Sequence, residues 1–264
     1  MVLPTAGLLA AVSLPPATPS QGESYRTPRT ADGNPDLNGI WQALGAAHWD
    51  LEGHAARPGP VLELGALGAV PAGLGVVVDG EIPYQPWAAA KKKENQENWL
   101  TADPAIKCFM PGIPRGTYMP FPFQIVQTPE HILVAYEFAS ATRIIYMDDD
   151  FESPADTWMG HSIGHWEGDT LVVDVTAHVP DTWFDSSGNF HTDALRVVER
   201  YTAISPNALM YEATIEDPNV FTRPWTIRMP LYRRLDENMQ LLEYKCIEFV
   251  EELMYGHLRK GASP

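Results

Sequence analysis

The second half of the chain is a succession of short, strand-like segments separated by turn sequences. The turns, among them Glu167-Gly168-Asp169 and Ser205-Pro206-Asn207, contain only a few residues. Connections this short join antiparallel neighbours, so the pattern predicts a mainly β fold in which an antiparallel meander forms a barrel or a sandwich. The predicted strands lie within 123–127, 131–138, 142–148, 164–176, 196–202, 209–217, 225–235 and 241–253.

Two segments in the first half of the chain add to this pattern. Gly39-Ile40-Trp41 follows a turn and resembles the start of lipocalin barrels, in which the tryptophan plugs one end. A lipocalin-like or calycin-like barrel is therefore favoured, and an ordinary core tryptophan is the alternative. Residues 85–100 are rich in helix formers and predict one helix of about four turns. A chain of 264 residues can fold as a single β-rich domain, which we predict over 23–264.

The N-terminal segment and the two cysteines suggest export. Residues 1–22 contain an apolar stretch from Leu8 to Leu14 and then a Pro/Ser/Thr-rich part, as at the end of a secretory signal peptide. A charged first part is missing, and a disordered leader is the alternative. Cys108 and Cys246 fit an exported protein if they form a disulfide, and two buried thiols are the equal alternative. We therefore expect a periplasmic or secreted protein.

Composition and motifs restrict the partners. The formal net charge of −16 repels nucleic acids and anionic lipid surfaces, so no nucleic-acid partner is predicted. No apolar run reaches the length of about 18 residues that a membrane helix needs, so we predict no membrane insertion. Nucleotide-binding glycine motifs and a thiolate zinc set are missing, and no cofactor is predicted. The sequence leaves oligomerisation open.

A pair of histidines, His161 and His165, has a spacing that would let both bind one metal ion on a helix. Gly160 and Gly164 argue against a helix there. In a strand the two histidines would lie about 13 Å apart. We therefore predict no metal site.

The segment from Asp181 to Asp193 holds the candidate catalytic residues. His191 and Asp193 are two residues apart, which places them on one face of an extended segment. A carboxylate at that position can hold an imidazole in one tautomer and raise its pKa, and Asp181 and Trp183 precede them across a turn. The alternative is structural, with Asp193 as a turn cap and His191 at a rim.

The alternation of side chains along the predicted strands indicates candidate ligand-binding residues. Glu199 falls on the apolar face of its strand, where a carboxylate needs an arginine, a hydroxyl or a ligand, and Arg223 is a plausible partner. By the same alternation Tyr211 lies on the face of its apolar neighbours. Arg115, among aromatic residues, can pair with a ligand anion or with backbone carbonyls. Trp158 is a candidate wall of a pocket.

The chain contains the motifs PDLNGIW (35–41), CFMPGIPR (108–115), PFQIVQTP (122–129), WMGHSIGHWEGDTLVVDV (158–175), HTDALRVVERY (191–201) and YEATIEDPNVFTRPW (211–225). Together these motifs resemble a family of exported bacterial proteins without an established activity, which implies export and a single domain. Two functions follow from the residues themselves. The first is binding of a small, largely apolar molecule by the barrel. The alternative is a cofactor-independent lyase, isomerase or hydrolase that uses the His/Asp pair.

Overall fold

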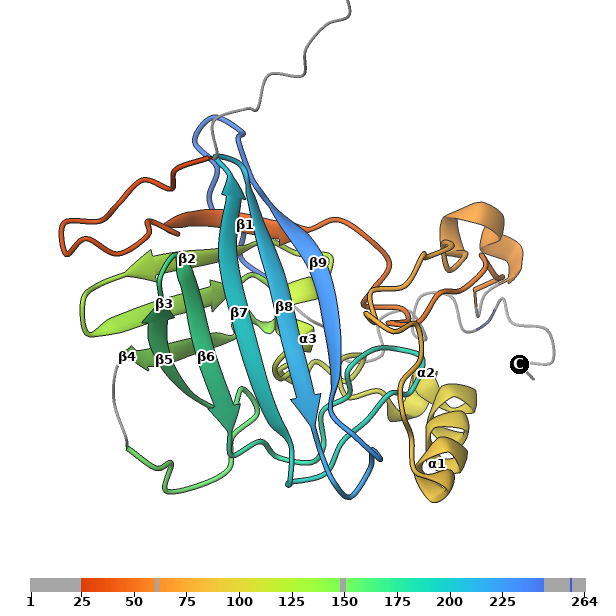
Figure 1. Ribbon diagram of the computed structural model, residues 1–264. Helices are drawn as coiled ribbons and strands as arrows, with labels where there is room; N and C mark the ends of the chain where they lie inside the picture. The colour runs from red at the N-terminus through yellow and green to blue at the C-terminus, as the bar shows by residue number, and fades with distance from the viewer. Residues whose placement is uncertain (1–24, 60–61, 148–150, 245–256, 258–264) are drawn as a thin grey trace, which may run out of the picture.

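The protein is a closed β-barrel, seen in a computed structural model that describes residues 25–59, 62–147, 151–244 and 257 (Figure 1). The mainly β prediction is confirmed. The strands are β1 (Gly39–Ala43), β2 (Phe123–Gln127), β3 (His131–Tyr136), β4 (Thr142–Met147), β5 (His161–Glu167), β6 (Thr170–Thr176), β7 (Arg196–Ser205), β8 (Ala208–Glu216) and β9 (Trp225–Arg233). The helical elements are η1 (Leu62–Gly68), α1 (Pro86–Glu97), α2 (Trp99–Ala102), α3 (Arg115–Tyr118) and η2 (Phe138–Ser140).

Consecutive strands are neighbours all around the barrel, and β1 closes it between β9 and β2. All pairings are antiparallel except that of β4 with β5, which is parallel. The predicted antiparallel meander therefore has one exception, the parallel pair of β4 and β5. The connection 148–160 is long enough to return the chain to the end of the sheet at which β4 began, which a short turn cannot do.

The C-terminal segment 241–253 was predicted to be the last strand, and it does not complete the barrel in the described part. Residues 241–244 have no regular secondary structure, and 245–253 lie outside the described residues. β1 takes the closing position instead. Its Trp41 is buried, donates from Nε1 to the Leu37 carbonyl at 2.9 Å, and carries the Arg233 guanidinium 4.2 Å above its ring. The tryptophan thus joins β1 to β9.

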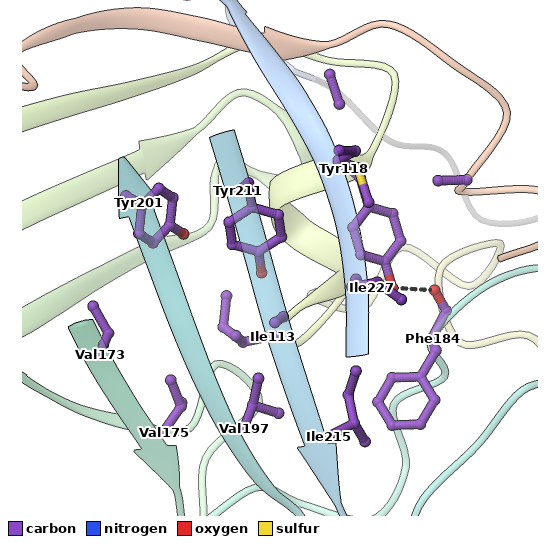
Figure 2. Close-up of a cluster of buried hydrophobic side chains, with 14 of the residues drawn as sticks. Ile113, Tyr118, Val173, Val175, Phe184, Val197, Tyr201, Tyr211, Ile215 and Ile227 are labelled. Carbon is purple, nitrogen blue, oxygen red and sulfur yellow. Dashed lines mark hydrogen bonds between the residues drawn. The ribbon is translucent and has the colours of Figure 1, made fainter. Parts of the chain in front are cut away.

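Alternate residues of each strand fill the barrel interior, as strand geometry requires. Tyr201 of β7 and Tyr211 of β8 are register partners inside the barrel, next to an apolar layer that includes Val175 and Val197 (Figure 2). The predicted inward face of Glu199 is confirmed, because this residue has no exposed surface. Large aromatic side chains occupy the centre, so the barrel is a packed core.

The predicted helix at 85–100 is confirmed, with a break. α1 ends at Glu97, and α2 begins at Trp99 after a change of direction at Asn98. α1 lies outside the barrel against the connection between β6 and β7, where the Asn95 amide donates to the Gly188 carbonyl at 3.2 Å. None of the described helices is long and apolar enough to cross a bilayer. Cys246 lies outside the described residues, so its pairing with Cys108 stays a prediction.

Candidate functional site

A cavity of about 570 Å³ lies beside the point where β4 and β5 begin to pair. Their parallel pairing begins at Ile145 and Ser162, and the residues before these positions border the cavity. Ligand pockets in proteins commonly have volumes of about 300 to 1,000 Å³. The residues that line it are Met110, Thr142, Arg143, Ile144, Tyr146, Ser153, Asp156, Thr157, Trp158, Met159, Gly160 and His161.

The segment before β5 reaches this position through a glycine. Gly160 has a φ of +68°, and a Cβ at this position would lie 2.7 Å from Nε2 of the buried His178. A larger residue would be strained and would clash with the imidazole. Gly160 therefore lets the segment that carries Trp158 and Met159 pack closely against the connection after β6.

Aromatic rings border the cavity on two sides. The half-buried Trp158 stacks on Phe109 with ring centroids 4.7 Å apart and planes 4° apart. The rings of Tyr146 and His161 lie 5.4 Å apart on β4 and β5. Stacked rings offer flat apolar surface that a planar ligand can contact. Trp158 is thus the predicted ligand-binding residue that the structure places at a cavity.

A buried ion pair crosses the barrel interior next to this cavity. Arg143 of β4 donates from Nη1 to Glu199 of β7 at 2.7 Å, and neither side chain is appreciably exposed. Arg143 also donates from Nη2 to the Tyr201 hydroxyl at 3.1 Å, and its Nη1 lies 3.4 Å from Ser162 Oγ. The hydroxyls of Tyr201 and Tyr211 donate to Glu199 Oε1 at 2.9 and 2.7 Å. We call these five residues the interior ion-pair cluster.

The two tyrosines of the interior ion-pair cluster stay protonated. Burial raises the pKa of Tyr201 and of Tyr211 well above the usual value, and the Glu199 carboxylate raises both further. The phenols therefore act as donors to Glu199. The carboxylate is satisfied by charge and by hydrogen bonds inside the protein, as a buried acid requires.

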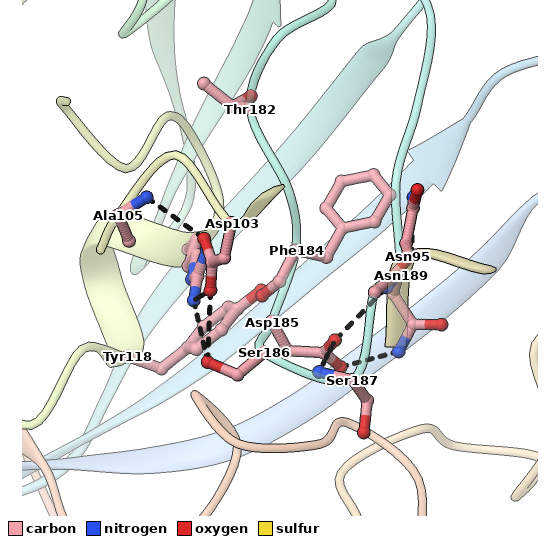
Figure 3. A network of polar contacts seen from close by, with 12 residues as sticks. Asn95, Asp103, Ala105, Tyr118, Thr182, Phe184, Asp185, Ser186, Ser187 and Asn189 are labelled. Atoms are coloured by element: carbon pink, nitrogen blue, oxygen red, sulfur yellow. Dashed lines mark hydrogen bonds and ion pairs between the residues drawn. The ribbon is translucent and has the colours of Figure 1, made fainter. Parts of the chain in front are cut away.

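Two arginines that were predicted to bind a ligand have other partners. Arg223 is exposed, with its Nη1 3.4 Å from Asp79, so the prediction that it pairs with Glu199 is wrong. Arg143 takes that place because β4 points it into the barrel. Arg115 is buried and donates from its two Nη atoms to the Asp103 carboxylate at 2.7 and 2.8 Å, part of the network in Figure 3. Its charge is compensated within the protein.

The candidate catalytic residues do not form the hydrogen-bonded pair that the sequence predicts. His191 is buried, its Nε2 lies 2.6 Å from the Thr182 hydroxyl, and its Nδ1 donates to the Thr192 carbonyl at 2.8 Å. Burial lowers the pKa of His191. Asp181 and Asp193 are both exposed, so the expected His191–Asp193 pair is not formed. The imidazole is held by threonines where a carboxylate was expected, and its catalytic role stays a prediction.

The connection that contains His191 is buried because it packs between α1 and the barrel. Asp185, without exposed surface, accepts hydrogen bonds from the backbone N–H of Leu51 and of Ser187, both at 2.9 Å, and from the Asn189 amide (Figure 3). Burial raises the pKa of Asp185 to about 7. These contacts tie the segment after β1 to this connection, which gives Asp185 a structural role.

The remaining predicted residues lie in separate places. Trp183 is buried within the same connection, away from the residues that line the cavity. His161 and His165 lie in β5, an extended strand as predicted, with His161 bonded to the Phe151 carbonyl and His165 3.3 Å from Glu167. The described part of the chain contains no group of three or more His, Cys, Asp or Glu side chains that could hold a metal ion.

Sequence reasoning missed Arg143, Tyr146 and Met110 as parts of the site. Arg143 had a readable signal, because its position in the alternation of β4 is the same as that of the buried Ile145. An inward arginine in a strand needs a buried acid. Met110 had no such signal, since its place at the cavity follows from tertiary packing.

No protein-family model matches the sequence, and no curated protein is significantly similar to it.

Proposed function

We propose that the protein is an exported β-barrel protein that binds a small, largely apolar molecule in the cavity beside β4 and β5. The observation that carries this proposal is the cavity itself, with a volume of about 570 Å³ and a stacked Trp158 at its border. Ile144, Met110 and Met159 add further apolar surface to the lining. Apolar walls with a few polar groups are typical of small-molecule sites.

The packing of the barrel supports a site in its wall. Trp41, Phe123 and Tyr211 are fully buried and fill the centre, where a ligand would need the space that they occupy. The cavity is lined by residues of β4, β5 and the segment before β5, and none of these three core residues is part of its lining. A ligand at this place contacts both the outer surface and the inward-facing Arg143.

Charge favours a neutral ligand. Asp156 is a carboxylate among the described residues that line the cavity, while the charge of Arg143 is compensated by Glu199. The formal net charge of −16 adds a negative field around the whole molecule. Anionic molecules are therefore disfavoured, in agreement with a largely apolar ligand.

The alternative of a cofactor-independent enzyme has less support. His191 does not line the cavity, and the two aspartates expected to orient it are exposed. Export rests on the apolar stretch of residues 8–14 and on the family resemblance. Cell fractionation of the producing bacterium tests it, and recovery of the protein in the cytosol would contradict it.

Replacing Trp158 with alanine is expected to weaken binding about tenfold or more, because the stacked indole provides a large apolar contact area. The measurement first requires a ligand, obtained by extraction of the purified protein and mass spectrometry or by a thermal-shift screen of apolar compounds. Binding is then compared by calorimetry. Trp87→Ala is the matched control, since Trp87 is exposed on α1 and does not line the cavity. A protein that contains no extractable molecule and responds to no apolar compound would overturn the proposal.

A further inference from the structure

Three buried polar groups beside the interior ion-pair cluster lack hydrogen-bond partners within the described part of the chain. They are the Nε of Arg143, the hydroxyl of Tyr136 and the hydroxyl of Thr117. All three side chains are more than nine-tenths buried, with exposed fractions of 4%, 3% and 0%. Buried polar atoms are nearly always satisfied by protein, water or a ligand. Three such groups in one place point to a further partner outside the described part of the chain, such as a bound molecule.

The three groups lie close to one another. Burial raises the pKa of Tyr136, whereas interactions with the Arg143 guanidinium and the Thr117 hydroxyl lower this pKa. Both groups therefore lie near the Tyr136 phenol. Thr117 belongs to α3, Tyr136 to β3 and Arg143 to β4, so separate elements bring them together. Arg143 Nε carries a hydrogen and no lone pair, and therefore needs an acceptor. The two hydroxyls can donate to the same atom.

The cavity extends to this place through two of its lining residues. Arg143 borders the cavity with one part of the residue and reaches Glu199 with its guanidinium. Met159 also lines the cavity. Its methyl group and the ring of Tyr136 are neighbours above Gly116, because each lies 3.5 Å from the position that a Cβ on this glycine would take. Met159 therefore lies between the cavity and the ring of Tyr136. Methionine is unbranched and adapts to what it contacts.

From these observations we infer that Arg143, Tyr136 and Thr117 bind a carbonyl oxygen of the molecule held in the cavity. The inference rests on the proposed function and narrows its ligand class to neutral, largely apolar carbonyl compounds. A carboxylate is disfavoured, because Glu199 already neutralises Arg143 and a second buried negative charge would have no counterion. A hydrocarbon would leave the three donors without an acceptor.

A matched pair of probes tests this inference. 2-Acetylnaphthalene carries a carbonyl group, and 2-ethylnaphthalene has nearly the same shape without one. Equilibrium dialysis of the full chain measures the affinity for each. We expect the ketone to bind about tenfold or more tightly than the hydrocarbon, from at least two hydrogen bonds of ordinary strength.

Two variants assign the preference to this place. Tyr136→Phe and Thr117→Val each remove a hydroxyl without changing the size of the side chain much. Each is expected to lower the affinity for the ketone about threefold to tenfold and to leave the affinity for the hydrocarbon unchanged. Both variants should fold, since each removes a polar atom that has no hydrogen-bond partner among the described residues. Tyr232→Phe, on the outer side of β9, is the control and should change neither affinity.

The outcomes separate the two proposals. Equal binding of both probes by the unchanged protein would overturn the carbonyl assignment and would leave the proposed function intact. Water would then be the partner of the three groups. A preference for the ketone that both variants retain would also overturn the assignment. Failure of both probes to bind would count against the cavity as an apolar site, and against both proposals.

Discussion

Replacing Glu199 with glutamine is expected to lower the free energy of unfolding by about 3 to 5 kcal/mol, because the change leaves the Arg143 charge buried without a counterion. Glu199 has no exposed surface and accepts hydrogen bonds from Arg143, Tyr201 and Tyr211. Glutamine keeps the shape and most of the hydrogen bonds, so the loss reports mainly on charge. Urea unfolding at pH 7, followed by circular dichroism, measures the difference.

A surface acid on the neighbouring strand provides the matched control. Asp174 of β6 accepts hydrogen bonds from Arg196 at 2.6 to 3.1 Å, but both side chains are substantially exposed. Exposed ion pairs contribute about 0 to 1 kcal/mol, so Asp174→Asn should have a small effect. The double variant Glu199→Gln/Arg143→Met should recover part of the loss, since it removes the uncompensated charge. Similar losses in the two single variants would contradict the argument.

The sequence allowed the barrel to be predicted because each antiparallel hairpin carries its own local signal. The turn at Gly168 with alternating residues on both sides is the clearest example, and it joins β5 to β6. The parallel pairing of β4 with β5 has no local signal. Its direction depends on where the connection 148–160 returns, which is a property of the whole fold. Closure by β1 is likewise a contact between distant parts of the chain.

The candidate site was predictable to a smaller extent. Strand alternation was enough to turn Glu199 inward, since that rule depends on neighbours in sequence. Its partner could not be assigned in the same way, because Arg143 reaches it across the barrel interior from a strand that is not adjacent. The burial of His191 was not predictable either. The connection around it is polar in sequence, and its place between α1 and the barrel comes from tertiary packing.

Lowering the pH from 6.5 to 4 is expected to destabilise the protein, and His178 should account for about 3 kcal/mol of the loss. This histidine has no exposed surface, neither ring nitrogen has a hydrogen-bond partner in the described part of the chain, and burial lowers its pKa to about 3. An unfolded chain binds a proton at this residue below about pH 6.5, while the folded protein does not. The stability that His178 contributes is therefore fully present above pH 6.5 and is lost as the pH falls towards 3.

Three other buried groups, His48, Asp185 and His191, contribute to the pH dependence of stability. Burial lowers the pKa of His48 to about 4, so this histidine also favours unfolding in acid. Burial raises the pKa of Asp185 to about 7, so its carboxyl keeps a proton in the folded state. The stability that this protonated carboxyl contributes is fully present below about pH 4 and is lost as the pH rises to about 7. Asp185 thus offsets one of the histidines. Burial also lowers the pKa of His191. Three histidines therefore oppose one carboxyl group, and the net change of the unmodified protein on acidification remains a loss.

Substitution of His178 separates these contributions. His178→Leu removes the titrating group together with two unsatisfied nitrogen atoms. Between pH 6 and 4 the free energy of unfolding of the variant should therefore fall less steeply than that of the unmodified protein, and the two slopes should differ by about 1.4 kcal/mol for each pH unit. Urea unfolding at several pH values within this range gives the slope. His131→Gln is the control, since His131 is exposed on β3 and its replacement should leave the slope unchanged. A His178→Leu protein with the slope of the unmodified protein would show that this imidazole gains its proton in the folded state as readily as in the unfolded chain, which would require water to reach the interior behind Gly160.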